Sequence, residues 1–432
     1  MSLRPPEQPF FFFMLIPIGT REDTTTNEIV SIDPDRHSSC FGMTGVGKST
    51  YLSAIEEHSI RSGLGSMVID PHGGIVDAVL KRIPKSRTHD VILVHAQKDR
   101  VAGVNIFDGE ATNDEKVAAV VDTFVKIFGS SFMFSSENVM RWACYAVLEG
   151  MHSPTLMDVK RFLKDKRFMA RVLSKVTNPN VLAEFEGYDT KDWERKRVEQ
   201  IAPVLNKLDQ FLAHSLIRAL VGQRGKGVDF RTVLDRKQIL LINLEGLGNR
   251  GAEMVGGFAF SQLFFASQRR KDRKSIHTVV IDEAQKFISS PIDFVLAESR
   301  KFGLSLHLGT QIISALPMNI REAIFGNVAT TAVYRVGGLD AEILIKELST
   351  NQPAYRLQDL PDYRAFVRYL AYSQQKGAKR PVGPFLTRMN PPSQPKGDEQ
   401  KRDVVIRESL KRHGRDREFI LKKIDEELRN HG

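Results

Sequence analysis

Short runs rich in valine, isoleucine and leucine alternate with longer helical patterns in two separate parts of the chain. Most of these runs lack regularly spaced polar positions, as expected for strands that are covered on both faces. The predicted strands are residues 28–32, 66–70, 90–95, 238–244, 277–283, 305–310 and 329–336. Strands that alternate with helices predict an α/β fold with a mainly parallel central sheet.

Between these two parts, residues 113–222 show a helical pattern throughout. Apolar positions recur at helical spacing, and β-branched runs are few. The predicted helices are residues 113–128, 137–151, 154–164 and 191–220. We therefore expect an all-α domain inserted into the α/β domain, with residues 1–112 and 223–386 forming the two parts of the latter.

The C-terminal residues 387–432 differ from the rest of the chain in composition and in the spacing of apolar residues. They begin with a linker rich in proline and polar residues, and continue into a charged helical pattern with sparse apolar positions. A surface helix or a flexible arm fits this pattern. A helix that docks onto a partner is the alternative.

Near the N-terminus lies one strongly apolar segment, residues 9–18. It contains prolines and is about half as long as a membrane-spanning helix. No small-residue cleavage site follows it, which makes a secretion signal the less favoured interpretation. We expect a buried edge strand or an interface segment, and no transmembrane segment.

Composition narrows the class of protein. Hydrophobic residues make up 41% and charged residues 26% of the chain, as in ordinary globular proteins. The two cysteines are too few for a disulfide framework or a zinc site, which favours a cytoplasmic setting, with contact to the inner membrane only through partners. The net charge of +10 fits either a polyanionic partner such as nucleic acid or a mildly basic enzyme.

The clearest chemical signal is a glycine-rich segment that matches the pattern G-x-x-x-x-G-K-[ST]. It lies between a short apolar segment and a predicted helix, where backbone N–H groups can surround phosphate groups. Lys48 would reach the β- and γ-phosphates of ATP, and the Ser49 hydroxyl would help to hold Mg²⁺. The predicted nucleotide-binding residues are Gly42, Met43, Thr44, Gly45, Val46, Gly47, Lys48, Ser49 and Thr50.

A P-loop ATPase also needs a carboxylate at the end of a buried strand close to this loop. One predicted strand ends in the pair Asp282 and Glu283. Asp282 would bind Mg²⁺, and Glu283 would polarise the attacking water. Such a pair is often only a helix start, but together with the glycine-rich segment it predicts the second half of an ATPase site.

Five further residues are candidates for supporting roles at the nucleotide. Arg300 and Arg335 could place a positive charge at the γ-phosphate, and in ring-shaped ATPases a neighbouring subunit can supply this charge. Gln311 directly follows a predicted strand and would either sense the γ-phosphate or cap the next helix. Asp70 and His72 follow another strand, where they would form a turn or approach the nucleotide.

Together these motifs resemble the HerA/FtsK-type pumping ATPases, and most closely the TraG/TraD-like coupling proteins of type IV secretion and conjugation. The resemblance covers about residues 14–375, and of its motifs only the glycine-rich segment is general to P-loop proteins. The others are IPIG at 16–19, DRH at 35–37, DPHG at 70–73, GVN at 103–105, IDEAQ at 281–285, ESRKFG at 298–303 and TQ at 310–311.

The resemblance implies a RecA-like motor domain that is interrupted by an all-α domain and assembles as a homohexameric ring. Such a ring would move double-stranded DNA with ATP and Mg²⁺, in contact with a relaxase, a nuclease or a secretion-channel protein. In that family an arginine after the Asp-Glu pair acts across the subunit boundary, which favours Arg300 over Arg335. The family glutamine that couples nucleotide state to DNA corresponds to Gln311.

We expect neither the membrane helices of coupling proteins nor the barrel domain of HerA proteins in this sequence, which leaves attachment to a secretion channel open. Loops 222–227, with Arg224 and Lys226, and 246–251, with Arg250, are candidates for gripping DNA phosphates. Two alternatives to a DNA translocase remain. One is an ATPase that powers protein export or secretion-system assembly, and the other is a nucleotide-gated recruitment module.

Overall fold

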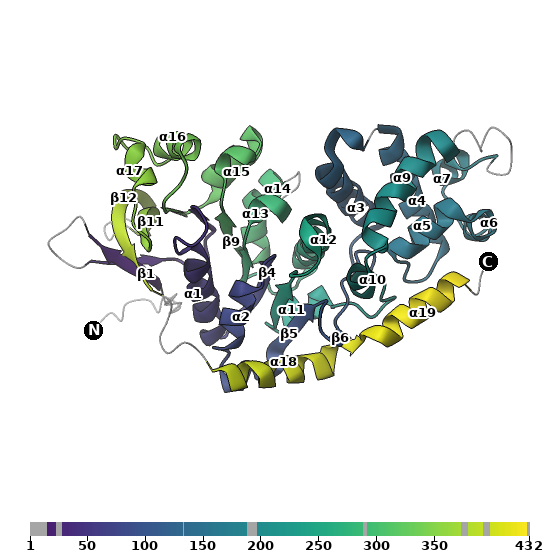
Figure 1. Cartoon of the computed structure of the whole chain (residues 1–432), viewed down its shortest axis with the longest axis horizontal. Coiled ribbons are helices and arrows are strands. Elements are labelled where there is room, and N and C mark those ends of the chain that lie inside the picture. The colour runs from purple at the N-terminus through teal and green to yellow at the C-terminus, as the bar shows by residue number, and fades with distance from the viewer. Residues whose placement is uncertain are drawn as a thin grey trace, which may run out of the picture.

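The computed structural model describes residues 15–22, 28–132, 134–187, 197–287, 292–372, 379–391 and 398–429. Its central element is an 11-stranded sheet with the order β2-β1-β12-β11-β10-β3-β9-β8-β4-β7-β5 (Figure 1). The strands from β10 to β5 are parallel, and the other four extend the sheet in antiparallel fashion at one edge. The predicted α/β fold with a mainly parallel sheet is confirmed.

The strands lie where the apolar runs predict them, with three additions. They are β1 (Ile16–Arg21), β2 (Ile29–Ile32), β3 (Ser38–Phe41), β4 (Gly65–Asp70), β5 (Val91–His95), β7 (Ile239–Asn243), β8 (His277–Ile281), β9 (Leu304–Thr310), β10 (Thr330–Val333), β11 (Arg364–Tyr372) and β12 (Lys379–Met389). The apolar pattern missed β3, which is short and half polar, and the arginine-containing strands β11 and β12. A second sheet joins β6 (Arg100–Val101) to β13 (Arg415–Asp416).

The predicted buried segment at residues 9–18 overlaps β1. Ile16 and Ile18 of this strand are 2% and 3% exposed, and β1 lies second from the edge of the sheet. Residues 9–14 lie outside the described part of the chain. Within the described residues, no helix has both the length and the apolar character needed to cross a membrane.

Helices cover both faces of the parallel sheet, because neighbouring strand residues point to opposite faces. Val68 belongs to a cluster with α1 (Lys48–Arg61) and α2 (Gly74–Leu80), whereas Met67 and Ile69 belong to a cluster on the other face. The helices that contribute to this second cluster include α11 (Phe230–Asp235), α12 (Gly248–Arg269), α13 (Ala284–Phe287), α14 (Ile292–Glu298), α15 (Met318–Asn327), α16 (Gly338–Glu347) and α17 (Tyr355–Gln358).

Between residues 113 and 221, every element that the structure describes is helical. A capping box starts this part: the Thr112 hydroxyl accepts from Glu115 N, and the Glu115 carboxylate accepts from Thr112 N. The main helices are α3 (Asn113–Phe128), α4 (Phe134–Gly150), α5 (Leu156–Lys164), α6 (Lys166–Leu173), α7 (Pro179–Glu184), α9 (Ala202–Leu212) and α10 (Ser215–Val221). We retain the division at residues 112 and 222 as a proposed domain organisation.

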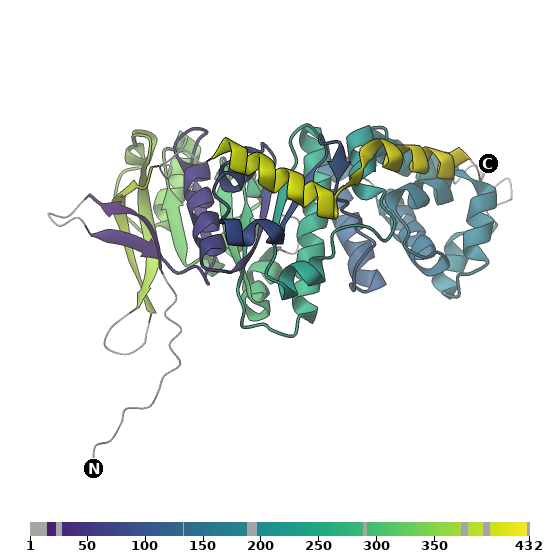
Figure 2. The same ribbon diagram turned by 90° about the horizontal axis from the view of Figure 1, so that it is seen from below.

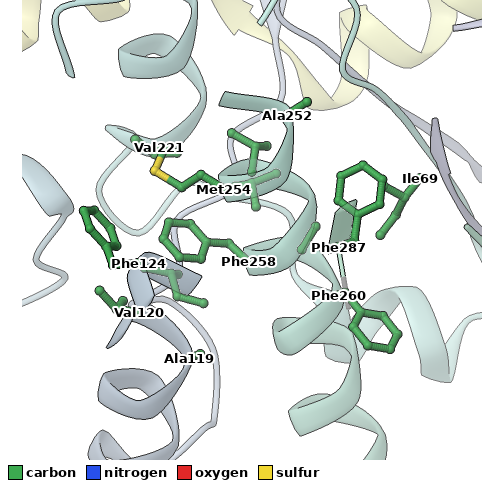
Figure 3. Close-up of a cluster of buried hydrophobic side chains, with 14 of the residues drawn as sticks. Ile69, Ala119, Val120, Phe124, Val221, Ala252, Met254, Phe258, Phe260 and Phe287 are labelled. Carbon is green, nitrogen blue, oxygen red and sulfur yellow. The ribbon is translucent and has the colours of Figure 1, made fainter. Parts of the chain in front are cut away.

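The helix α12 packs between the sheet and the inserted helices (Figure 3). Its Phe258 lies toward Val120 and Phe124 of α3, while Phe287 and Ile69 lie on the other side of α12. These side chains belong to one hydrophobic cluster that continues from the sheet into the helical part. The inserted helices therefore pack against α12, which in turn covers the sheet.

Two C-terminal helices run along one side of the molecule, from the sheet to the inserted helices (Figures 1 and 2). They are α18 (Glu399–His413) and α19 (Arg417–Arg429). α18 packs along β5, whose Leu93 N–H donates to Ser409 Oγ at 2.8 Å, and α19 packs on α10. The described C-terminal helices are therefore docked surface helices, whereas a flexible arm was the other expectation for this segment.

Candidate active site

The glycine-rich loop joins β3 to α1 and has the backbone shape that binds phosphate in P-loop proteins. Gly45 and Gly47 have φ values of 84° and 118°, a left-handed region in which a Cβ is unfavourable. α1 begins directly after Gly47, at Lys48, so the free N–H groups of its first turn face the pocket. The Lys48 ammonium donates to the carbonyls of Gly42 and Met43 at 2.6 and 2.8 Å.

The Asp-Glu pair follows β8 and lies at the same edge of the sheet as this loop. Thr44, Gly45, Gly47, Lys48, Ser49, Thr50, Asp70, His72, Gly74, Ile75, Asp282, Glu283, Gln311 and Tyr363 line a pocket of about 340 Å³. The parallel strands place their carboxyl ends together, which explains why segments far apart in sequence meet there. The structure thus brings together both predicted halves of the site.

Asp282 lies in an environment that suits a divalent cation. Burial raises the pKa of its carboxyl to about 7, and the nearby negative charges of Asp70 and Glu283 act in the same direction. Gly309 makes room for this carboxylate, because a Cβ there would lie 3.0 Å from Asp282 Oδ1. Crowded, buried carboxylates are relieved by a bound cation.

The oxygen donors of the pocket fit Mg²⁺. The Ser49 hydroxyl and the Asp282 carboxylate are both hard oxygen ligands of the kind that Mg²⁺ prefers. Mg²⁺ usually keeps several waters and binds phosphate oxygens as well, so it needs few protein ligands.

Glu283 is held in an unusual backbone conformation. Its φ is 52°, which is rare for a residue with a side chain and typical of strained positions at functional sites. Its N–H donates to Asp282 Oδ1 at 3.1 Å, and its carboxylate accepts from the side-chain amide of Gln285. The first contact holds the Glu283 backbone, and the second holds its carboxylate.

Asp70 forms the turn that precedes α2. Its two carboxylate oxygens accept four backbone N–H groups at 2.7–3.1 Å, from residues 72, 73, 75 and 76. Asp70 therefore forms a turn, which was one of its two predicted roles. Its negative charge also raises the pKa of Asp282. His72 and Gln311 line the same pocket, where either could approach a nucleotide.

The two candidate arginines do not line this pocket in the described chain. Arg300 is exposed in the short helix η4 (Ser299–Phe302). Arg335 is held within its own subunit, because its guanidinium contacts Asp362 at 2.7 Å and the Leu360 carbonyl at 2.9 Å. A role for Arg300 across a subunit boundary stays a prediction.

Tyr363 lines the pocket but was not predicted from the sequence. Tyr363 lies between α17 and β11, and its N–H donates to the Val46 carbonyl at 2.9 Å. No motif marks it, because only the antiparallel extension of the sheet brings it beside the loop. The two glycine-basic loops stay predictions: Arg224 is bound to Asp158 and Glu427, and Arg250 donates to Gln210 at 2.8 Å.

Comparisons with known proteins agree with this geometry. Residues 16–123 match the family model described as helicase HerA, central domain. No curated protein matches the sequence. The resemblance to HerA-type ATPases is confirmed for this part of the chain.

Three solved structures share the fold at low sequence identity. The plasmid coupling protein TrwB in complex with ADP and Mg²⁺ is 14% identical, with a TM-score of 0.60, 90% of this chain and 97% of that chain covered. The unbound bacterial conjugative coupling protein TrwBdeltaN70 is 15% identical, with a TM-score of 0.59. The match covers 88% of this chain and 93% of that chain. VirB4 of Thermoanaerobacter pseudethanolicus is 12% identical, with a TM-score of 0.59. The match covers 89% of this chain and 98% of that chain. The chain has the P-loop ATPase fold of these proteins, as predicted.

Proposed function

We propose that this chain is an ATP-driven translocase of double-stranded DNA that works as a homohexameric ring. The observation that carries the proposal is the pocket that joins the loop around Lys48 to Asp282, Glu283 and Gln311. The similarity of the fold to conjugative coupling proteins supports a role in DNA transfer or DNA processing.

The phosphate groups of ATP bind to the backbone N–H groups at Gly45–Lys48, with the Lys48 ammonium at the β- and γ-phosphates. Ser49 and Asp282 hold Mg²⁺, which neutralises charge on the phosphates when bound. Glu283 accepts a hydrogen bond from the attacking water and takes up its proton. Gln311 lies at the γ-phosphate end and senses whether that group is present.

Arg300 completes the site from the neighbouring subunit. An arginine that acts in trans must be exposed in the isolated subunit, and Arg300 is exposed. Arg335 is the weaker candidate, because Asp362 and the Leu360 carbonyl already occupy its guanidinium. The assignment favours a ring in which hydrolysis depends on assembly.

DNA binds through its phosphates, without readout of base sequence. The net charge of +10 and the basic side chains of Lys226 and Arg250 support this mode.

We place the protein in the cytoplasm, where it reaches the inner membrane only through partners such as a relaxase, a nuclease or a secretion-channel protein. The similarity to VirB4 keeps an ATPase of protein export or secretion-system assembly as the second candidate.

The test is steady-state ATP hydrolysis by the full chain, measured with and without duplex DNA at increasing salt. A translocase is expected to show stimulation by DNA of several-fold, which declines as salt weakens the phosphate contacts. ATP hydrolysis that DNA does not change at any salt concentration would contradict the DNA substrate and favour the export ATPase. Steady hydrolysis with DNA but without directional movement along it would favour a recruitment module.

A further inference from the structure

The backbone of Tyr363 is clamped between the phosphate-binding loop and the edge of the sheet. Its φ is 58°, a conformation that a residue with a side chain adopts only where the surroundings fix it. Its N–H donates to the Val46 carbonyl, and its carbonyl accepts from the Met389 N–H, both at 2.9 Å. These two bonds fix where the tyrosine side chain leaves the backbone.

The ring of Tyr363 forms part of the pocket wall beside Gly47. A Cβ built on Gly47 would lie 3.1 Å from Tyr363 Cδ1, so the ring lies directly against the loop. The ring is only partly buried, and it lines the same pocket as Lys48 and Glu283. An aromatic side chain therefore borders the space in which a nucleotide would bind.

The strand order places Tyr363 and the carboxylates on different sides of the loop. Glu283 follows β8 and Gln311 follows β9, and both strands lie on one side of β3. Tyr363 directly precedes β11, which lies beyond β10 on the other side of β3. A nucleotide whose γ-phosphate lay at Glu283 would extend its nucleoside along the loop toward the opposite side of β3, which carries Tyr363.

From this geometry we infer that Tyr363 stacks on the base of the bound nucleotide, and that the P-loop holds the phosphates independently. The inference rests on the proposed ATPase function and adds its nucleoside-binding residue. Stacking on an aromatic ring stabilises a bound base without reading its hydrogen-bonding edge. The ring therefore contributes affinity for nucleoside triphosphates and none for the phosphate chain alone.

The experiment compares two ligands, Mg·ATP and Mg·tripolyphosphate, by titration calorimetry on the full chain. Tyr363→Ala is expected to raise the Kd for ATP about tenfold and to leave the Kd for tripolyphosphate unchanged. Tyr363→Phe keeps the ring and should bind both ligands like the wild type. Tyr355→Ala is the matched control, because Tyr355 is 60% exposed on α17 and does not line the pocket.

Tyr363→Leu separates stacking from support of the loop, since leucine keeps apolar bulk beside Gly47 but has no ring. It should lose ATP affinity like the alanine variant and keep tripolyphosphate affinity, and it also replaces that variant if alanine does not fold. Equal losses for both ligands, or unchanged ATP affinity in both variants, would overturn the inference. A wild-type chain that binds neither ligand would instead contradict the proposed ATPase function.

Discussion

Glu283 combines a position that the sequence marks with a backbone conformation that the structure reveals. The sequence interpretation predicts its role from the apolar strand before it, and the structure adds a left-handed backbone and a contact with Gln285. These features direct the carboxylate at the pocket that contains Lys48. The arrangement suits a general base, which must lie within hydrogen-bonding reach of the water that it activates.

Glu283→Gln is expected to bind Mg·ATP with wild-type affinity and to hydrolyse it about 100-fold to 10,000-fold more slowly, because glutamine cannot take up the proton. Nucleotide binding and steady-state hydrolysis measured on the same preparation check this. Glu298→Gln is the control, since Glu298 pairs with Lys301 away from the pocket. Hydrolysis by Glu283→Gln at the wild-type rate would exclude Glu283 as the base.

The lowered pKa values of two buried histidines, His37 and His307, predict how the free energy of unfolding depends on pH. Burial lowers the pKa of His37 to about 4 and the pKa of His307 to about 3, with Arg300 and Arg36 also lowering the former. Both rings stay neutral in the folded chain, whereas the unfolded chain protonates them below about pH 6.5. Their contribution to stability is therefore complete above pH 6.5 and declines as the pH falls toward 4.

The measurement is the urea midpoint between pH 7.5 and 4.5 for the wild type and His37→Asn. The variant should lose less stability over this range, by about 2 kcal/mol, because one buried ring no longer titrates. His152→Asn, which changes an exposed histidine, should follow the wild type. Identical pH profiles for all three chains would contradict the buried neutral state of His37.

Site residues that are marked by their sequence neighbours could be predicted, whereas residues that reach the site only through long-range strand pairing could not. Lys48, Ser49 and Asp282 are marked by their neighbours in sequence, because strand, loop and helix follow one another there. Tyr363 carries no such mark, since its place beside Gly47 depends on the pairing of β10, β11 and β12. The same limit applies to Arg224, whose ion pairs link residues from three separate helices and loops.

At the scale of elements, the C-terminal helices hold the sheet and the inserted helices together. Both side-chain oxygens of Asp158, on α5, accept from the Arg224 guanidinium at 2.6 Å, and Arg224 Nε donates to Glu427 on α19 at 2.9 Å. The Asp158 side chain is 2% exposed, and Arg224 is its charged partner, beside the hydrogen bonds from Thr155. Ile424 of α19 packs next to Gly222 in the same region.

Arg224→Ala is expected to lower the free energy of unfolding by about 2–3 kcal/mol, because it leaves a buried carboxylate with fewer partners. Hydrogen–deuterium exchange should also rise across α19. Arg407→Ala, which removes an exposed arginine on α18, should change neither quantity. Unchanged exchange in α19 of Arg224→Ala would contradict a role of this ion pair in docking the helix.

The elements themselves were predictable to different degrees. Strands covered on both faces, such as β4, β7 and β8, are continuous apolar runs that leave little ambiguity. β3 has the sequence SSCF and becomes a strand because β9 and β10 pair with it on both sides. The docking of α18 was not predictable from its sparse apolar positions, since only Val405 and Leu410 of these are buried and the buried Ser409 is polar.

At the scale of the whole molecule, a shared active site predicts complementation between variants. In the proposed ring, Arg300→Ala and Glu283→Gln should each slow hydrolysis by at least about 100-fold. Equal amounts of the two variants that mix at random should restore about a quarter of the active sites, each using Glu283 of one subunit and Arg300 of its neighbour. Hydrolysis measured across mixing ratios checks this, and no recovery at any ratio would count against Arg300 acting in trans.

The most direct test is magnesium-dependent ATP hydrolysis by the purified full chain, with Lys48→Ala measured beside the wild type. The pocket formed by the loop at Lys48 and the pair Asp282–Glu283 predicts turnover by the wild type that requires Mg²⁺. The same pocket predicts loss of both binding and turnover in Lys48→Ala. Wild-type protein that neither binds nor hydrolyses Mg·ATP, or a Lys48→Ala variant that is equally active, would contradict it.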